Sequence, residues 1–516
     1  MEFNVLTATA NELQDMLSSP GGVDSKHLVK TYLAQIKLHN DYLKAVVDTA
    51  PESLLMERAN VLDDERKKGK IRSLLHGIPI LIKDNIATNS STGLGTTAGS
   101  LALVNSNPRD NAPIVDRLNR YQAARRRSHR ARQGQLVRTL VVEVGDPISL
   151  TLMGTGLICG WSAVSGQSQS PYVRGGVLPD DSYAGHSNPG GSSSGPAIAV
   201  AAGFAPMSIG TETFGSLMLP AGRAALYSIK PSRSHISTIG IVPISSFSDQ
   251  PGPMTKTTKD LAVVMDIITD PGNVPSGGYV SRVTGSWEGL KIGTLDPEKW
   301  NFPPVARKIL DEGMEEQLNG EVRDAYEVIK HHAPVFKGNV PLSSVDVLTL
   351  NGDDVLLKIF EKDFKREFES YLKLLDNPQV RSLGELIAFN EQHAGRELPS
   401  GNDNQDVLKR CEKTNMTAED RAACVAHAEK FGCEQGINKV FDEYGINIIM
   451  GPLESPLASF AAACGYPVAS MPLGYLDYNG RPHGLCAVAR EEGLLIQLQS
   501  AYEATFPQRR TPTLVS

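Results

Sequence analysis

The sequence has few cysteines and no long hydrophobic run. Its 516 residues include six cysteines, with no Cys-x-x-Cys pair and no recognisable zinc-binding pattern, so we expect free thiols and no metal centre. No stretch approaches the roughly 18 uninterrupted apolar residues that a membrane span requires. The first residues also lack the basic and apolar segments of a secretory signal. We therefore expect a cytoplasmic protein without a membrane partner.

The sequence is also short of positive charge. It has 51 Lys and Arg against 58 Asp and Glu, a net charge of −7, and this balance gives no reason to expect a nucleic-acid partner. Neither a G-x-x-x-x-G-K-[ST] loop nor a G-x-G-x-x-G fingerprint is present, which argues against a nucleotide-binding site. The hydrophobic content of 41% and the charged content of 21% are ordinary for a globular protein.

Helical and strand patterns occur along the whole chain. Asp24 and Ser25 can cap a helix with a one-sided apolar face, and a second helix is expected from about Glu52 to Lys68. Short apolar runs predict buried strands at 77–85, 206–209, 290–293 and 446–452. The sequence shows no internal repeat and no clear linker, so we favour one continuous domain.

The strand predicted at 77–85 brings Lys83 to its end. A lysine at such a position is commonly solvated, but the flanking apolar residues place its stem in the core. A buried lysine loses the solvation of its charge, so its pKa falls and a neutral amine becomes available. Lys83 is therefore a candidate general base.

Two serine-bearing, glycine-rich turns surround a small-residue apolar helix. The first turn is Gly190–Gly195, and the second, Gly210–Ser216, follows a short apolar strand. A serine at such a turn presents its hydroxyl while successive backbone N–H groups point into one space, the arrangement that stabilises an oxyanion. Serine needs a base to act as a nucleophile. The nearby histidines have no recognisable place in a triad, and we interpret them as structural or surface residues: His76, His186 and His235.

These motifs resemble the signature of the amidase signature family, and the protein looks like a fungal-type amidase. The resemblance rests on Gly77–Ile86 and Gly185–Pro231 and extends to Ile446–Pro452 and Ala461–Pro472, in the family's order, over most of the chain. It implies an α/β fold, in which a large mixed twisted sheet is covered by helices on both faces. It also implies an enzyme that cleaves carboxylic amide bonds through an acyl-enzyme, releases ammonia or an amine and uses no cofactor.

The resemblance also assigns roles to residues. Ser216 corresponds to the nucleophile, Ser192 to a bridging serine and Lys83 to the base, in a relay that also protonates the leaving amine. The backbone amides of Thr213, Phe214, Gly215 and Ser216 would form the oxyanion hole, and Ser193 would brace the bridging serine. Phe214 departs from the family pattern, because many relatives have glycine there, and a positive φ would strain it. Arg223 is also unusual, and we expect it to pair with a structural acid rather than with a substrate carboxylate.

One stretch does not fit this pattern. Arg125–Arg138 contains six arginines, but without interleaved aromatic residues or a recognisable module we do not interpret it as a nucleic-acid site. In relatives, the segment matching Asp110–Asn119 leads into a buried strand, which we expect to be missing here. Permitted codons for Arg132–Val144, read one base later, give Gly-Lys-Ala-Asn-Leu-Ser-Glu, which resembles the family segment. The hypothesis is a frameshift or splice error over roughly Tyr121–Leu157, and the alternative is a genuine polar insertion.

Within one amidase domain of residues 1–516, we expect four parts: N-terminal helices at 1–75, the signature core at 76–270, a variable helical substrate-access region at 271–400, and the C-terminal part of the core at 401–516. The expected partner is a small-molecule amide, and a homodimer remains open. Two alternatives also remain. One is an amidotransferase component that passes ammonia from glutamine to a partner protein. The other is a catalytically impaired paralogue or an erroneous reading frame.

Overall fold

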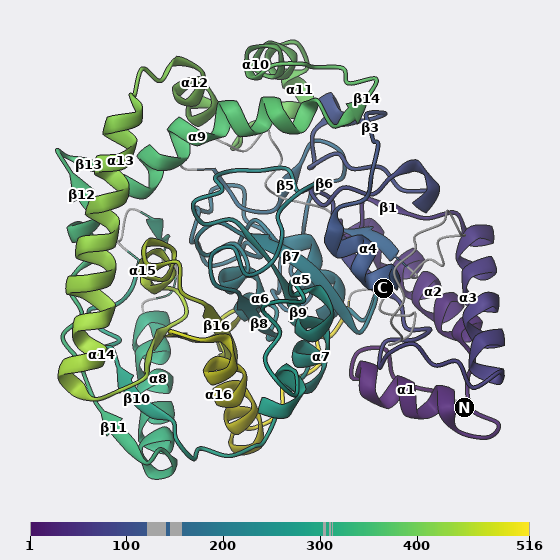
Figure 1. Ribbon diagram of the computed structural model, residues 1–516, viewed down its shortest axis with the longest axis horizontal. Coiled ribbons are helices and arrows are strands. Elements are labelled where there is room, and N and C mark those ends of the chain that lie inside the picture. The colour runs from purple at the N-terminus through teal and green to yellow at the C-terminus, as the bar shows by residue number, and fades with distance from the viewer. Residues whose placement is uncertain are drawn as a thin grey trace.

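The computed structural model describes residues 2–120, 141–144, 157–302, 306–308, 311 and 313–514, with Arg120 and 141–144 described by their backbone only. Strands from every quarter of the chain form one mixed sheet (Figure 1). Across the sheet its eleven strands are β1 (Asp48–Thr49), β4 (Val141–Val144), β2 (Ile80–Lys83), β7 (Met207–Glu212), β9 (Gln250–Thr255), β8 (Tyr227–Lys230), β16 (Val468–Tyr475), β17 (Pro482–Ala489), β15 (Ile448–Pro452), β10 (Lys291–Thr294) and β11 (Val335–Lys337).

Both kinds of strand pairing occur in this sheet. β4, β2 and β7 are parallel neighbours, and so are β15, β10 and β11, while the strands between these groups pair antiparallel. Successive side chains of a strand point to opposite faces, so a strand buried on both faces feeds two cores. In β17, Leu485 and Ala487 enter one core, while Cys486 and Val488 enter the other. The predicted α/β fold with both faces covered is confirmed.

Helices cover the two faces of the sheet. On one face lie α1 (Ala10–Ser18), α2 (Ser25–Leu43), α3 (Glu52–Lys67), α4 (Pro113–Arg120), α7 (Thr258–Ile268), α8 (Gly313–His332) and α16 (Glu492–Thr505). On the other face lie α5 (Ser194–Ala201), α6 (Met218–Arg223), α14 (Lys439–Tyr444) and α15 (Leu457–Cys464). The two N-terminal helix predictions are confirmed: the Asp24 side chain accepts from the His27 N–H at the start of α2, and α3 follows.

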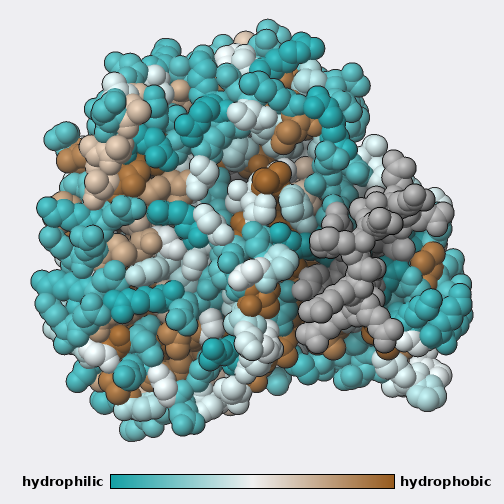
Figure 2. Space-filling model, in the orientation of Figure 1, coloured by the Kyte–Doolittle hydropathy of each residue, from teal (hydrophilic) through white to brown (hydrophobic). Residues whose placement is uncertain are grey.

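A further group of helices forms the green arc along the top and left of Figure 1. It comprises α9 (Val355–Leu372), α10 (Leu383–Gln392), α11 (Ala394–Glu397), α12 (Asp406–Lys413), α13 (Ala418–His427) and the π-helix Ala428–Asn438. These helices have apolar clusters of their own, in which α9 packs against α12 and α13. In the same view, Figure 2 shows a mostly hydrophilic surface that is interrupted by hydrophobic side chains below α9.

The chain also contains short 3-10 helices and three small two-stranded sheets. The 3-10 helices are Ser90–Thr92, Leu101–Leu103, Tyr279–Arg282 and Val345–Leu348. Three two-stranded sheets pair β3 (Asn107–Pro108) with β14 (Leu375–Asp376), β5 (Trp161–Ser162) with β6 (Gly166–Gln167), and β12 (Thr349–Leu350) with β13 (Asp353–Asp354). Among the residues described, no helix is both long enough and apolar enough to cross a lipid bilayer.

The prediction that a sheet strand is missing after α4 is wrong. β4, with the sequence Val-Val-Glu-Val, lies between β1 and β2, and Val142 is paired with both Leu81 and Thr49. Three β-branched residues in four favour an extended strand, and the arginine-rich composition of the preceding residues obscured this signal. Arg125–Arg138 itself lies outside the described residues, as does the segment Tyr121–Leu157 except for β4 and its last residue.

Candidate active site

Lys83 is the last residue of β2, a strand with strand neighbours on both sides. All four residues of β2 are buried, and Lys83 is only 1% exposed, so the prediction that this lysine is buried is confirmed. Its Nζ lies 2.6 Å from Ser192 Oγ and 2.9 Å from Thr211 Oγ1. The parallel pairing of β2 with β7 explains the second contact, because the two strands end at the same edge of the sheet and Thr211 lies near the end of β7.

The first glycine-rich turn delivers Ser192 to this lysine. Gly190 has φ +74°, a backbone conformation that favours glycine, and the peptide bond between Gly191 and Ser192 is cis. The next residue holds the turn against β7: the Ser193 hydroxyl donates to the Thr211 carbonyl at 3.0 Å and accepts from the Thr211 N–H at 3.1 Å. Ser192 and Ser193 are both buried, and α5 begins directly after them.

The second turn carries Ser216 and packs against the first turn. Gly215 takes φ +96°, and the Ser193 N–H donates to the Ser216 carbonyl at 3.0 Å, which joins the two turns through their backbones. Glu212 fixes the far side of this turn, because its Oε2 accepts two backbone N–H groups at the start of α6, at 2.7 and 3.0 Å. No hydrogen bond joins the Ser192 and Ser216 hydroxyls among the described residues.

The backbone amides of Thr213, Phe214, Gly215 and Ser216 are the donors that the sequence singled out. Within the described part of the chain, none of these four N–H groups donates a hydrogen bond. Buried backbone donors are nearly always paired in folded proteins, so the amides of this turn are a candidate site for an acceptor from outside the chain. Thr213 and Ser216 are buried, and the two residues between them are partly exposed.

Phe214 fits this turn without backbone strain, because the positive φ falls on Gly215. Its side chain packs against the apolar cluster that includes Val355 and Ile359 of α9. The sequence flagged Phe214 as a departure from relatives with glycine, but it could not show what the ring contacts, since the packing partners lie about 140 residues further along the chain.

Sequence reasoning missed two polar residues of the site. Thr211 Oγ1 accepts from Asn85 Nδ2 at 3.0 Å as well as from Lys83. Asp249 Oδ1 accepts from the Thr213 hydroxyl at 2.7 Å. Burial raises the pKa of Asp249 to about 6, although the hydrogen bond from Thr213 opposes the rise. Only the antiparallel pairing of β7 with β9 brings Asp249 to the turn, and no local motif signals that contact.

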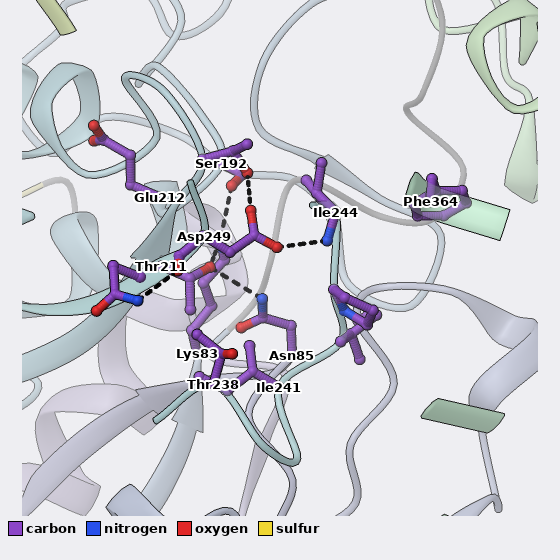
Figure 3. A pocket seen from close by; sticks show the side chains of 15 residues that line it. Lys83, Asn85, Ser192, Thr211, Glu212, Thr238, Ile241, Ile244, Asp249 and Phe364 are labelled. Atoms are coloured by element: carbon purple, nitrogen blue, oxygen red, sulfur yellow. Dashed lines mark hydrogen bonds between the residues drawn. The ribbon is translucent and has the colours of Figure 1, made fainter. Parts of the chain in front are cut away.

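A cavity of about 30 Å³ that opens to solvent is lined by Lys83 and Ser192. In Figure 3 the side chains of Lys83, Ser192 and Asp249 lie together, and Phe364 of α9 lies apart from this group. The charged residues that line it, among those described, are Lys83, Glu212 and Asp249. Its apolar wall consists of Ile241, Val242, Pro243, Ile244 and Phe364.

A buried cluster of charged residues is linked to the first turn by hydrogen bonds. Arg223 Nε lies 3.2 Å from Glu454 Oε1, and Arg481 also binds this carboxylate. Arg223 Nη1 donates to Asn188 Oδ1 at 2.8 Å, and the same oxygen accepts from the Gly190 N–H at 2.9 Å. Burial alone would raise the pKa of Glu454, but the two arginines outweigh it and lower that pKa to about 2. The prediction that Arg223 pairs with a structural acid is confirmed.

The three histidines noted in the sequence have partners elsewhere. His76 contacts the Leu62 carbonyl, His186 the Tyr478 hydroxyl and His235 the Tyr279 hydroxyl. All six cysteines are unpaired. Among the described residues, no group of three or more His, Cys, Asp or Glu side chains is placed to hold a metal ion.

Comparisons with known proteins show which family the chain belongs to. The family model for Amidase matches residues 27–124 and 165–428. A protein of Arabidopsis thaliana described as a probable amidase is 30% identical over 100% of this chain and 93% of its own. A glutamyl-tRNA(Gln) amidotransferase component of Chloroflexus aggregans is 31% identical over 60% of this chain and 56% of its own. The solved peptide amidase of Stenotrophomonas maltophilia matches with a TM-score of 0.81 and 28% identity, covering 99% of both chains. The chain therefore belongs to the amidase family.

Proposed function

We propose that this amidase hydrolyses carboxylic amides through a relay from Lys83 through Ser192 to Ser216. The observation that carries the proposal is the 2.6 Å contact between the buried Lys83 Nζ and Ser192 Oγ. It lies beside the turn whose four amides have no acceptor among the described residues. In the proposed relay Ser192 connects the base to the nucleophile, which requires the Ser216 hydroxyl to approach Ser192 Oγ when a substrate binds.

The first half of the reaction forms an ester. The neutral Lys83 amine takes the Ser192 proton while Ser192 takes that of Ser216, and Ser216 Oγ attacks the amide carbonyl carbon. The carbonyl oxygen becomes an oxyanion, which the amides of 213–216 stabilise without reorganising. The Lys83 ammonium then returns its proton through Ser192 to the leaving nitrogen, and the C–N bond breaks as ammonia or an amine departs.

The second half regenerates the enzyme. A water molecule loses its proton to the relay and attacks the Ser216 ester at the same carbonyl carbon, above the same oxyanion site. The C–O bond to Ser216 breaks, and Ser216 recovers a proton through Ser192. The net reaction is amide plus water to carboxylic acid plus ammonia or amine, and the steps use only groups of this chain and water.

The cavity favours an uncharged, apolar substituent on the amide. Its wall of four consecutive residues, 241–244, and Phe364 removes apolar surface from water. A glutamine donor would bring a carboxylate, and apart from Lys83, which the relay requires as a neutral base, no Lys, Arg or His is among the described residues that line the cavity. The amidotransferase alternative is therefore less well supported than hydrolysis of a neutral small-molecule amide, a class that includes peptides with an amidated C-terminus.

We also propose that residues 1–516 act as one amidase domain in which 271–400 shapes access to the site. Phe364 of α9 supports this role, because it comes from that segment and lines the cavity. The same segment contributes β10, β11 and α8 to the sheet and its covering layer, so its function includes packing as well as access.

A screen of primary and substituted amides with mass-spectrometric detection of the acid tests the proposed function. We expect hydrolysis of neutral amides with an apolar acyl group, and we expect Ser216→Ala to abolish it while the variant keeps the wild-type circular dichroism spectrum. Hydrolysis that survives in Ser216→Ala, or ammonia release that requires an added second protein, contradicts the proposal.

A further inference from the structure

The carboxylate of Asp249 holds two separate segments of the site together. Its Oδ1 accepts from the Thr213 hydroxyl at 2.7 Å, in the turn whose amides have no acceptor among the described residues. Its Oδ2 accepts from the backbone N–H groups of Ile244 and Ser245, at 2.7 and 2.9 Å, in the loop that forms the apolar wall of the cavity. Hydrogen bonds to an ionised carboxylate are roughly twice as strong as neutral ones, so these three contacts define one rigid unit.

The same loop is attached to α9. The Ser245 hydroxyl donates to Asp363 Oδ2 at 2.9 Å. Ser246 donates twice to Glu367, from its N–H at 2.9 Å and from its hydroxyl at 2.7 Å. Asp363 and Glu367 are one helical turn apart, and Phe364, which lines the cavity, lies between them. The loop therefore fixes the part of α9 that lines the cavity.

A second contact, which is apolar, also links the turn to α9. Phe214, the neighbour of Thr213, packs against the cluster that includes Val355 and Ile359, near the start of α9. The turn thus contacts α9 at two places. The Phe214 ring packs against the N-terminal half of α9, and Asp249 with the loop connects the turn to the centre of α9.

We propose that Asp249 is a positioning residue that couples the oxyanion-hole turn to the α9 wall of the substrate cavity. This inference rests on the proposed function. Oxyanion donors act only when they lie about 2.7–3.1 Å from the position of the developing charge. Phe214 and Gly215 are partly exposed, so the turn needs an anchor on its first residue, and the Thr213 hydroxyl provides one.

The ionisation of Asp249 is consistent with this role. Burial and, to a smaller extent, Glu367 of α9 raise its pKa, the hydrogen bonds from Thr213, Ile244 and Ser245 oppose the rise, and the resulting pKa is about 6. Lys230 of β8 also acts on this carboxyl, and Lys83 and Glu212 line the same cavity. Protonation below about pH 6 turns one acceptor oxygen into a donor and breaks a contact of the unit.

Three variants with one control test the coupling. Thr213→Val removes one hydrogen bond and keeps the side-chain shape. Asp249→Ala removes all three, whereas Asp249→Asn keeps them, because its oxygen can accept from both loop amides while its NH₂ donates to the Thr213 oxygen. The control is Thr349→Val, the same substitution at an exposed residue of β12. For each protein we would measure kcat and KM against pH, the rate of fluorophosphonate labelling, and the thermal midpoint.

We expect Thr213→Val to lower kcat about 10-fold and Asp249→Ala about 100-fold, with KM changed less than about 2-fold, since hydrogen bonds to an ionised group are among the stronger ones in proteins. The double variant Thr213→Val/Asp249→Ala should be no slower than Asp249→Ala. Asp249→Asn should stay within about 3-fold of wild type and lose the acid limb near pH 6. Labelling rates should follow kcat, and the control should match wild type.

The outcomes separate this inference from the proposed function. If the wild type hydrolyses amides and is labelled, but Thr213→Val matches it in both rates, the coupling is wrong and the relay stands. Additive losses in the double variant, or an Asp249→Asn variant as slow as Asp249→Ala, also overturn the coupling. If the wild type neither hydrolyses amides nor is labelled, the proposed function fails and the coupling fails with it.

Discussion

At the scale of single residues, the site depends on a lysine that the sheet has removed from water. Lys83 is 1% exposed and its Nζ contacts two hydroxyl oxygens. Burial disfavours the charged form of a lysine, so this environment suits a group that must accept a proton. In the proposed relay, the contact with Ser192 sets the direction in which that proton is exchanged.

Lys83→Met removes the base and preserves most of the side-chain volume. We expect kcat for amide hydrolysis to fall about 1,000-fold, within the range that general-base catalysis contributes. The thermal midpoint should not fall, because a buried amine is replaced by an apolar group. Lys373→Met, at an exposed position just after α9, is the matched control and should retain full activity. Turnover near the wild-type rate in Lys83→Met would refute the relay.

Glu454 provides a stability prediction with a defined pH window. Glu454→Gln leaves Arg223 and Arg481 without their carboxylate, so we expect a loss of about 3 kcal/mol in the free energy of unfolding near pH 7. The folded-state pKa, about 2, is below the ordinary value of 4.5, so this stabilisation is complete above about pH 4.5 and disappears as the pH falls towards 2.

Urea unfolding of Glu454→Gln and wild type between pH 2 and 8 measures this loss. The exposed pair of Glu298 and Arg323 offers a matched control, since Glu298→Gln should cost less than about 1 kcal/mol. A Glu454→Gln deficit that does not change with pH would contradict the assigned cause.

At the scale of elements, the motifs with strong local signals were predictable and the long-range contacts were not. The sequence predicted β2 and its lysine, both glycine-rich turns and α2, because apolar runs, glycines and a capping residue determine these features locally. The sequence did not predict the Asp249–Thr213 contact or the partners of Phe214, because strand pairing and helix packing bring those residues together. The prediction of a missing strand was wrong because it relied on family likeness rather than on the β-branched content of β4.

Val142→Pro tests whether β4 is an integral strand of the sheet. Val142 is paired with Leu81 of β2 and Thr49 of β1, and proline cannot donate to a strand ladder. We expect a loss of about 3 kcal/mol or more in stability, judged by the cost of proline inside regular structure, together with loss of soluble protein. Val142→Thr keeps the N–H and the β-branch and should fold. A well-folded, active Val142→Pro variant would mean that β4 is dispensable.

At the scale of the whole molecule, one sheet joins distant parts of the chain. β16 and β17, near the C-terminal end of the sequence, lie next to β8 and β15, and β8 leads through β9 and β7 to β2. The loop at 244–246 attaches α9 to this sheet, and the cluster under α9 includes Ala462 and Ala463 of α15. These contacts argue that the helical arc and the sheet unfold together.

We therefore expect a single thermal transition. Two of the three tryptophans, Trp287 and Trp300, belong to the two cores beside the sheet, so tryptophan fluorescence reports mainly on the sheet. Circular dichroism at 222 nm reports on helices throughout the molecule. The two probes should give coincident midpoints, as expected for a two-state transition. A helical transition that precedes the fluorescence change would identify α9–α13 as a separately folding unit.

The most direct test of the proposed mechanism is the site of covalent modification by a fluorophosphonate. We would label the full-length protein, digest it and locate the adduct by peptide mass spectrometry. The relay predicts one adduct on Ser216, with labelling lost in Ser216→Ala and at least about 100-fold slower in Lys83→Met, as expected when a general base is removed. A well-folded wild-type protein that takes no label, or that is labelled elsewhere with Ser216 unmodified, would contradict the mechanism.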